Sequence, residues 1–215
     1  MEKPIMVGLG KGAEHGILIK SGAALERAQA MTTIVFDKTR TLTIGEPRVT
    51  DVVALGGRGR KEILWYAAIA ERGSEHPLAG AVVAEAMREV KDIPYADRFE
   101  AIPGEGVRAR YKDKEILLGN EKLMAANGVD VSSLRRQIEK LEGEGKTTVI
   151  LAVDGRAIGI IAVSDVLREN SKRAVDELRK AGVEVMMLTG DNKRTAEAIA
   201  KKVGIDLVLA EVPPQ

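Results

Sequence analysis

The sequence predicts an α/β fold, namely a doubly wound parallel sheet with an α+β domain inserted after its first strand. Three patterns favour this fold. A short β-branched run at 32–36 is followed directly by Asp37. Beyond Ser164 the pattern alternates helix, strand, helix and strand, which is typical of a parallel sheet with crossover helices. Residues 45–163 mix helix and hairpin signals, so we expect a separate unit there.

The chain opens with a segment rich in glycine. Four glycines crowd its first twenty positions: Gly8, Gly10, Gly12 and Gly16. This segment looks too glycine-rich for a regular helix, whereas 22–31 reads as a short one. The first strand of the sheet is predicted at 32–36. The turn-forming run Gly45-Glu46-Pro47 then marks the start of the inserted unit.

The inserted unit is predicted to contain three helices and six strands. The helices are expected at 61–71, 77–90 and 131–141, the second with Pro77 in the favoured first turn. The strands are expected at 49–55, 99–102, 107–111, 115–118, 147–153 and 156–163. Asp154-Gly155 is a typical two-residue hairpin turn and joins the last two strands.

The final region returns to the parallel sheet. Its elements are expected as helix 170–181, strand 183–188, helix 193–203 and strand 207–209. Because these alternate in the same way as crossover units, the strand at 32–36 should belong to their sheet. Residues 31–44 and 164–215 are therefore expected to form one discontinuous domain.

Composition excludes several classes of function. The 33 basic and 32 acidic residues nearly cancel, so no broad field indicates nucleic acid, which we do not expect as a partner. The 215 residues include no cysteine, which excludes disulfides, thiolate metal sites and cysteine catalysis and favours a cytosolic compartment. No apolar run approaches the roughly 20 residues that span a bilayer, so we expect a soluble chain without a signal peptide.

Asp37 is the first candidate for chemistry. Open α/β sheets bind ligands at the carboxyl ends of their strands, and an Asp there can act as a nucleophile that forms an aspartyl-phosphate. A strand followed by a polar turn is the simpler interpretation of an isolated Asp. Further along the chain, Thr189-Gly190-Asp191 follows the strand 183–188 and precedes a helix.

Thr189, Gly190 and Asp191 form the second candidate site. A Thr hydroxyl and backbone N–H groups at a helix N-terminus suit a phosphate, although such a motif alone is most often an ordinary helix cap. Asp37 and Thr189 both follow strands assigned to one sheet. We therefore expect the nucleophile and the phosphate anchor to share one crevice.

The block from Asp37 to Thr43 reads D-K-T-R-T-L-T and resembles, in six of seven positions, the D-K-T-G-T-L-T signature of P-type ATPases. The resemblance implies that Asp37 accepts a phosphate, that Lys38 and Thr39 complete the catalytic motif, and that Asp37 and Thr39 hold Mg²⁺. Arg40 departs from the family, which has Gly there. A glycine would serve a backbone conformation that a side chain opposes, at a cost of about 1 kcal/mol.

Thr39 separates a pump from a phosphatase. Phosphatases of the haloacid dehalogenase type, whose sheet this fold resembles, carry a second Asp two residues after the nucleophile as general acid and base. Thr39 cannot take that role at neutral pH. An aspartyl-phosphate on Asp37 should therefore persist, which favours a pump intermediate over the alternative of a free-standing phosphatase with a cap domain.

The inserted unit resembles the nucleotide-binding domain of heavy-metal-transporting (type IB) P-type ATPases. The matching elements are Glu71, Ser74-Glu75-His76-Pro77-Leu78, Gly104-Glu105-Gly106 and Gly119-Asn120. The resemblance implies that Glu71 and His76 face the adenine of ATP. Its remaining contacts would come from Gly104, Gly106, Val107, Gly119 and Asn120. On its own, a loop histidine before a proline is more often a surface or capping residue than a ligand contact.

Together these motifs resemble the cytoplasmic ATP-binding and phosphorylation region of a metal pump, with copper favoured weakly by Glu75. Residues 1–30 would then be a membrane-exit segment and linker helix, 45–163 the nucleotide-binding domain, and 31–44 with 164–215 the phosphorylation domain. Ser164-Asp165-Val166-Leu167-Arg168 resembles the family's hinge-side D-x-x-R, and a loop ion pair explains it equally well. The resemblance implies ATP and Mg²⁺ as cofactors. The transmembrane and actuator domains of a parent pump at the membrane's cytoplasmic face would be its partners.

The family's downstream G-D-G-x-N-D carboxylates do not follow Asp191, and the sequence stops at Gln215. We therefore expect an incomplete phosphorylation domain with weak or no activity of its own, so a nucleotide-binding fragment without catalysis stays an alternative. An incomplete sheet would leave the strand 207–209 as an exposed edge, able to pair with a second copy.

Overall fold

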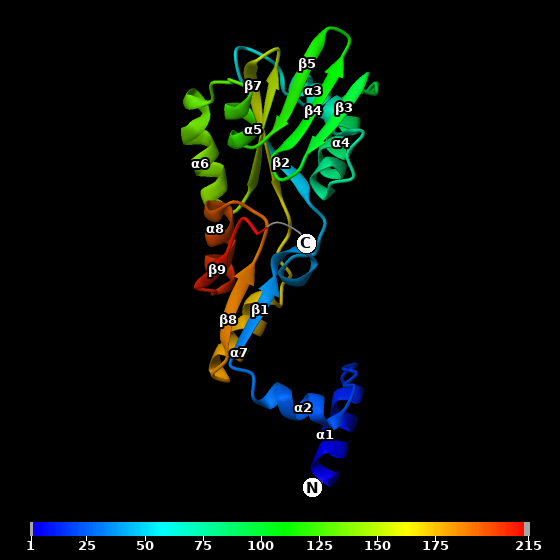
Figure 1. The fold of residues 1–215 in the computed structure, drawn as a ribbon, viewed down its shortest axis with the longest axis vertical. Helices are drawn as coiled ribbons and strands as arrows, with labels where there is room; N and C mark the ends of the chain where they lie inside the picture. The colour runs from blue at the N-terminus through cyan, green and yellow to red at the C-terminus, as the bar shows by residue number, and fades with distance from the viewer. Residues whose placement is uncertain (1, 213–215) are drawn as a thin grey trace.

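The computed structural model describes residues 2–212 and contains two sheets of different kinds, joined in one elongated arrangement (Figure 1). One sheet is antiparallel and the other parallel. Helices α1 (Glu2–Glu14) and α2 (Gly22–Gln29) extend from the far end of the parallel sheet. Met1 and residues 213–215, which the predicted units 1–30 and 164–215 include, lie outside the described residues. No described helix is both long and apolar enough to cross a membrane.

The parallel sheet has three strands in the order β1-β8-β9. They are β1 (Thr33–Asp37), β8 (Glu184–Leu188) and β9 (Leu207–Leu209). Helix α7 (Ser171–Lys180) precedes β8, and α8 (Lys193–Val203) connects β8 to β9. Right-handed crossovers that advance in one direction place their helices on one face of a sheet. Accordingly, α7 and α8 contact each other and share one core with the sheet.

The opposite face of the parallel sheet is open among the described residues. Val35, Leu207 and Leu209 are 50%, 42% and 46% exposed, whereas Val185 and Met187 on the helix-covered face are 6% and 0% exposed. The register joins Val35 to Met186 and Met186 to Leu207, so the two exposed side chains lie on either side of the half-buried Met186. This sheet therefore has one buried face and one exposed face.

The antiparallel sheet has six strands in the order β2-β7-β6-β5-β4-β3. They are β2 (Arg48–Ala54), β3 (Arg98–Ile102), β4 (Gly106–Tyr111), β5 (Lys114–Gly119), β6 (Thr147–Val153) and β7 (Arg156–Ser164). Helices α3 (Arg60–Glu71) and α4 (Pro77–Glu89) cover one face. Helices α5 (Glu121–Ala126) and α6 (Arg135–Gly143), with a short 3₁₀ turn at Ser132–Leu134, cover the other.

Side-chain alternation explains why this sheet is covered twice. Successive residues of a strand point to opposite faces, so an unbroken apolar run supplies two cores. In β5, Ile116 and Leu118 belong to the core with α3 and α4, and Leu117 belongs to the core with α5 and α6. All three are at most 3% exposed. The sheet is a stable platform between two helical layers.

The strand predictions are confirmed, each to within one residue at either end. The hairpin turn is also as predicted, because Asp154 and Gly155 both have positive φ, at 49° and 74°. Helices α2, α3, α4, α7 and α8 lie where they were expected. The predicted helix at 131–141 is formed by the 3₁₀ turn and α6, which ends two residues later.

Two predictions of secondary structure were wrong. The glycine-rich opening forms helix α1, and its glycines allow close packing on α2. A Cβ on Gly8 would lie 2.9 Å from Leu25, and one on Gly22 would lie 2.7 Å from Ile5. This contact offsets the low helix propensity of glycine. Helix α5 was not predicted at all, although Asn120 caps it by accepting a hydrogen bond from the Leu123 N–H at 3.1 Å.

Candidate active site

The ends of β1 and β8 bring the two candidate motifs together. Asp37 is the last residue of β1, and its neighbour in the parallel register is Leu188, which directly precedes Thr189. Asp37 is exposed, while Thr189 is 4% exposed. The Thr189 hydroxyl accepts a hydrogen bond from the Asp191 N–H at 3.1 Å. An open carboxylate and a fixed hydroxyl therefore lie at adjacent strand ends.

The turn after Asp37, Lys38–Leu42, has an unusual backbone. Arg40 has φ 63° and ψ −5°, which is the left-handed conformation that glycine adopts without strain. The predicted conformational need at this position is therefore present, and a side chain there costs about 1 kcal/mol. At the start of the turn, the Thr39 N–H donates to the Asp37 carboxylate at 3.4 Å, which fixes the direction of that side chain.

Arg168 and Ser171, from the segment that enters α7, hold this turn in place. The Arg168 guanidinium donates to the carbonyls of Thr43, at 3.0 Å, and Arg40, at 3.1 Å. The Ser171 hydroxyl donates to the Leu42 carbonyl at 2.8 Å. These bonds satisfy the carbonyls of Arg40 and Thr43 and add a second partner to the Leu42 carbonyl, which also accepts from the Arg168 N–H at 2.9 Å. The strained conformation of Arg40 is thus supported from outside the turn.

Asp165 joins the two chain crossings between the sheets. Its carboxylate accepts hydrogen bonds from the Gly45 N–H, at 3.1 Å to each oxygen, and from the Glu46 N–H at 3.1 Å. Both residues of the predicted D-x-x-R pair, Asp165 and Arg168, therefore bind the segment that follows Asp37. They do so through backbone groups, and no ion pair between them is found among residues 2–212.

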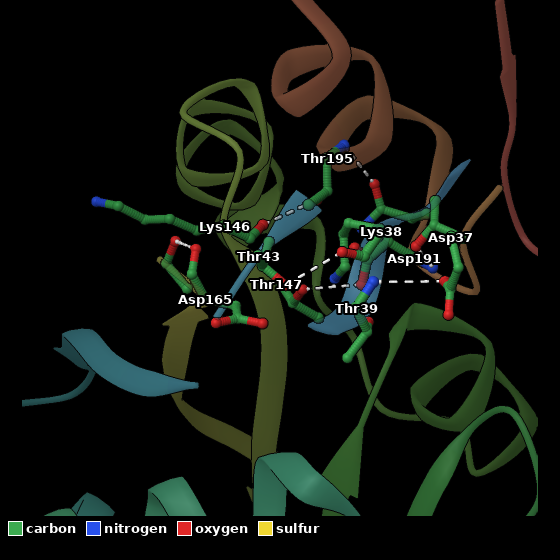
Figure 2. Close-up of polar contacts among 12 residues, drawn as sticks. Asp37, Lys38, Thr39, Thr43, Lys146, Thr147, Asp165, Asp191 and Thr195 are labelled. Atoms are coloured by element: carbon green, nitrogen blue, oxygen red, sulfur yellow. Dashed lines mark hydrogen bonds and ion pairs between the residues drawn. The ribbon is translucent and has the colours of Figure 1, made fainter. Parts of the chain in front are cut away.

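Lys38 and Asp191 form the main ion pair of the site. The Lys38 Nζ lies 2.5 Å from one oxygen of Asp191, and the two side chains are only 11% and 12% exposed. The other oxygen of Asp191 accepts a hydrogen bond from the Thr147 hydroxyl at 3.1 Å. Thr147 begins β6, in the antiparallel sheet, so one carboxylate joins three separate segments of the chain (Figure 2).

Glu71 and His76 lie at the end of α3 and the start of α4. Glu71 is 8% exposed, and one of its carboxylate oxygens has no partner among the described residues. Burial raises the pKa of Glu71 to about 6, although a hydrogen bond with Ser74 opposes the shift. His76 is exposed at the helix start, where its ring accepts from the Leu78 N–H at 3.3 Å. Desolvation lowers the pKa of His76, while the charge of Asp191 opposes this shift.

The glycines of the insert have a packing role of their own. Gly106 and Gly119 are partners on β4 and β5. A Cβ on Gly106 would lie 2.3 Å from the Leu118 carbonyl oxygen, and one on Gly119 would lie 2.2 Å from the Glu105 carbonyl oxygen. Gly104 instead lies in the β3–β4 turn with φ 74° and open space around it. Of these three glycines, only Gly104 has open space where a Cβ would lie.

Asn120 and Val107 are placed by the fold itself. Asn120 caps α5, and its amide nitrogen donates to the Gly104 carbonyl at 2.9 Å, which ties the β3–β4 turn to the end of β5. Val107 is 5% exposed and lies in the core beneath α3 and α4. The predicted nucleotide residues thus come from neighbouring loops and strand ends of one sheet.

The chain is similar to known proteins in sequence and in fold. Residues 31–213 match the sequence model of a family described as haloacid dehalogenase-like hydrolase. The chain belongs to the haloacid dehalogenase-like hydrolase family. The predicted sheet type is confirmed by this match, and the antiparallel sheet lies in the chain between β1 and β8.

Relatives within the family are metal pumps. The chain is 47% identical over 211 residues to the copper-exporting P-type ATPase of Bacillus subtilis, and 53% identical over 211 residues to a probable copper-exporting P-type ATPase of Archaeoglobus fulgidus. Each alignment covers 98% of this chain and 26% of the relative. The resemblance to P-type ATPases is confirmed, and the chain spans about a quarter of the length of these relatives.

Solved structures agree. A zinc-transporting PIB-type ATPase in its E2.Pi state is 38% identical with a TM-score of 0.70, over 98% of this chain and 34% of that one. The catalytic domain of the CPx-ATPase CopB-B is 27% identical with a TM-score of 0.67, over 94% of this chain and 69% of that one. The family's P-type ATPase branch therefore shares both the sequence and the fold of this chain.

Thr147 is the site residue that sequence reasoning missed. It was predicted only as the first residue of a strand, and no local pattern marks it as a partner of Asp191. Its role depends on a contact between the two sheets, and the pattern of a single sequence does not predict such a contact.

Proposed function

We propose that this chain is the ATP-binding and phosphorylation region of a copper-transporting P-type ATPase. In the complete pump, the γ-phosphate of ATP would be transferred to Asp37. The observation that carries the proposal is the exposed carboxylate of Asp37 at the end of β1, next to the strand end that is followed by the buried Thr189. Residues 45–163 would form the nucleotide-binding domain, and 31–44 with 164–215 the phosphorylation domain.

Transfer would proceed by attack of a carboxylate oxygen of Asp37 on the γ-phosphorus. The bond from that phosphorus to the β–γ bridging oxygen breaks as the new bond forms, and ADP leaves with the electron pair. The carboxylate is already anionic, so the attack needs no general base. The Thr189 hydroxyl accepts from the Asp191 N–H, which leaves its hydrogen to donate to a phosphate oxygen. Thr39 supplies no general base for hydrolysis, so the aspartyl-phosphate persists.

The residues present suit Mg²⁺ bound mainly by phosphate and water. No cluster of three or more acidic or histidine side chains occurs among residues 2–212. Mg²⁺ keeps several waters and is commonly held by one or two carboxylates together with substrate phosphates. Asp37 offers such a carboxylate, and Thr39 lies next to it. Mg²⁺ bound there would neutralise charge that develops on the transferred phosphate.

ATP would be held between the two sheets. The buried carboxyl of Glu71 has an oxygen without a partner among the described residues, which suits a hydrogen bond to the adenine amino group. The antiparallel sheet contacts Asp191 through Thr147, so a nucleotide bound at α3 and α4 would direct its phosphates toward Asp37. The open Gly104 turn and the capping Asn120 would form the rest of the cradle, with Gly106, Val107 and Gly119 behind it.

In the complete pump this region would lie at the cytoplasmic face of a membrane, with residues 1–30 leading to the transmembrane domain and an actuator domain as a further partner. A second copy could also pair with β9, since its Leu207 and Leu209 are exposed at the sheet edge. Analytical ultracentrifugation tests that pairing, and a monomer at all concentrations would exclude it.

Phosphorylation is tested with γ-labelled ATP and the complete pump. We expect an acid-stable, hydroxylamine-labile label that disappears in Asp37→Asn. A label that survives in Asp37→Asn would place the phosphate elsewhere. Calorimetry of ATP binding, with His76→Ala, tests the insert separately, because a nucleotide-binding module without catalysis would bind ATP and show no label. Unchanged affinity in His76→Ala would remove His76 from the site.

A further inference from the structure

The two sheets are joined by a polar interface between the α6–β6 turn, residues 142–148, and helix α8 with the loop before it. The bonds that cross it are Thr147 to Asp191 at 3.1 Å, Asn192 to Glu142 at 3.0 Å, Arg194 to Glu142 at 3.4 Å, Thr195 to the Lys146 carbonyl at 2.8 Å and Lys202 to the Glu144 carbonyl at 2.5 Å. We call this set the α6–α8 interface.

Glu142 fixes the register of the α6–α8 interface. Its side chain is only 10% exposed, and a buried carboxylate is stable only when it is well paired. Its partners are the Thr148 hydroxyl on its own sheet, at 3.1 Å, and Asn192 and Arg194 on the other. The same Asn192 caps α8 by accepting from the Thr195 N–H at 3.0 Å. The turn therefore meets α8 in one defined position.

This position brings the Thr147 hydroxyl to the Asp191 carboxylate. Asp191 has two oxygens, of which one receives Lys38 and the other receives Thr147. A carboxylate held at both oxygens cannot rotate, so its partner Lys38 is also held, one residue after Asp37. Figure 2 shows Thr147 and Lys38 close to Asp191.

We propose that Thr147 is a positioning residue for phosphorylation of Asp37, a role that rests on the proposed function. Its hydroxyl orients Asp191, and through Asp191 it orients Lys38 beside the nucleophile. The hydrogen bond between Thr147 and Asp191 exists only while the antiparallel sheet is docked at the α6–α8 interface. Docking of that sheet is thereby coupled to the geometry of the phosphorylation site, and undocking releases Asp191 from one of its two partners.

The test compares four forms of the complete pump: the parent protein, Thr147→Val, Thr147→Ser and Thr50→Val. Valine keeps the shape of threonine without its hydroxyl, and serine keeps the hydroxyl. Thr50→Val is the matched control, because the Thr50 hydroxyl donates within its own sheet, to the Ala162 carbonyl at 3.4 Å. The rate of aspartyl-phosphate formation at saturating ATP and the dissociation constant of ATP are measured for each.

We expect Thr147→Val to slow phosphorylation about ten- to a hundredfold, as the loss of one hydrogen bond to a charged group predicts, with ATP affinity within about twofold of the parent. Thr147→Ser should restore most of the rate, and Thr50→Val should leave both quantities unchanged. An unchanged rate in Thr147→Val would overturn the proposal. An equal loss of rate and affinity would do the same, since it indicates a general effect on folding or docking.

Failure of the proposed function gives a different result. If the parent protein forms no aspartyl-phosphate, the proposed function fails, and the positioning role fails with it. Hydrogen exchange then still reports on the contact itself. Faster exchange of the Asp191 to Thr195 amides in Thr147→Val, and not in Thr50→Val, shows that the hydroxyl orders this loop. Unchanged exchange together with an unchanged rate removes Thr147 from the site.

Discussion

The two sheets differ in the interactions that stabilise them. The antiparallel sheet is buried on both faces by helices and is held by two apolar cores. The parallel sheet is buried on one face only, and its reactive end is held by polar contacts, mainly the Lys38–Asp191 pair and the bonds made by Asp165 and Arg168. The antiparallel half is therefore fixed by packing on both faces, and the reactive end of the parallel half by charge and hydrogen bonds. The first should be rigid, and the second should respond to changes in its partners.

Removing Asp191 tests the polar half most severely. We expect Asp191→Ala to destabilise the parallel sheet by about 3–5 kcal/mol, because it leaves the buried ammonium of Lys38 without a counterion. Denaturant unfolding and hydrogen exchange measure the effect in each sheet. The control is Asp206→Ala, whose exposed pair with Arg179 should be worth less than about 1 kcal/mol. Equal loss of protection in both sheets would show that they unfold as one unit.

A glycine substitution tests the packed half. Gly106→Ala should destabilise the antiparallel sheet by about 2–4 kcal/mol, since its Cβ would lie 2.3 Å from the Leu118 carbonyl oxygen and its φ is 147°. The matched control Gly104→Ala has positive φ and open space, so about 1 kcal/mol is expected. Thermal unfolding measures both. Equal and small losses of stability in the two variants would mean that β4 and β5 can move apart to make room for a side chain. The antiparallel sheet would then not be rigid.

The buried Glu71 predicts a pH dependence. Its pKa in the folded state is raised from 4.5 to about 6, so the folded chain binds more protons than the unfolded chain between these values. Stability should therefore fall as pH rises from 4.5 to 6, by about 2 kcal/mol, and stay lower at neutral pH. Glu71→Gln should remove this fall and unfold at a higher temperature at pH 7, while binding ATP more weakly.

Calorimetry across the pH range measures this difference. The exposed neighbour Glu75→Gln serves as the control and should keep the parent's pH profile. A persistent fall between pH 4.5 and 6 in Glu71→Gln would assign the proton to another group. Higher stability of Glu71→Gln with unchanged ATP affinity would mean that Glu71 does not contact the nucleotide.

The smallest expected effect concerns the turn after Asp37. Arg40→Gly should stabilise the chain by about 1 kcal/mol by relieving the left-handed conformation, and should raise the yield of aspartyl-phosphate in the complete pump. Lys112→Gly is the control, because Lys112 has a similar φ of 54° in a hairpin remote from the chemistry. It should stabilise the chain without changing the yield. Equal yields in both variants would leave Arg40 with a purely conformational cost.

Local patterns predicted most of the fold. The strands were found because β-branched runs and turn residues are short-range signals, and the meeting of Asp37 with Thr189 followed from both lying at strand ends of one parallel sheet. The predicted need for a special backbone at Arg40 agrees with its φ of 63°. These features depend on residues that are close in sequence or on a general rule of α/β sheets.

The missed features depend on distant residues. Helix α1 forms against its own propensity because Gly8 packs on Leu25, which a propensity argument cannot include. The ion pair between Lys38 and Asp191 joins residues far apart in sequence, and Thr147 comes from the other sheet. Such contacts form because the two sheets dock together, and no spacing within the sequence predicts them.

The paired chain crossings have a consequence for modularity. Ile44 and Val166 share a backbone hydrogen bond at 2.8 Å, and Asp165 binds the Gly45 and Glu46 amides, so the chain leaves the parallel sheet and returns to it at a single point. The host sheet can therefore be closed without the insert, because chain ends that lie close together tolerate such replacement, although the bonds of the α6–α8 interface are then lost. The antiparallel sheet can in this sense be replaced as a unit. A direct link from residue 44 to residue 166 should yield a minimal protein that keeps Asp37 and Thr189 together.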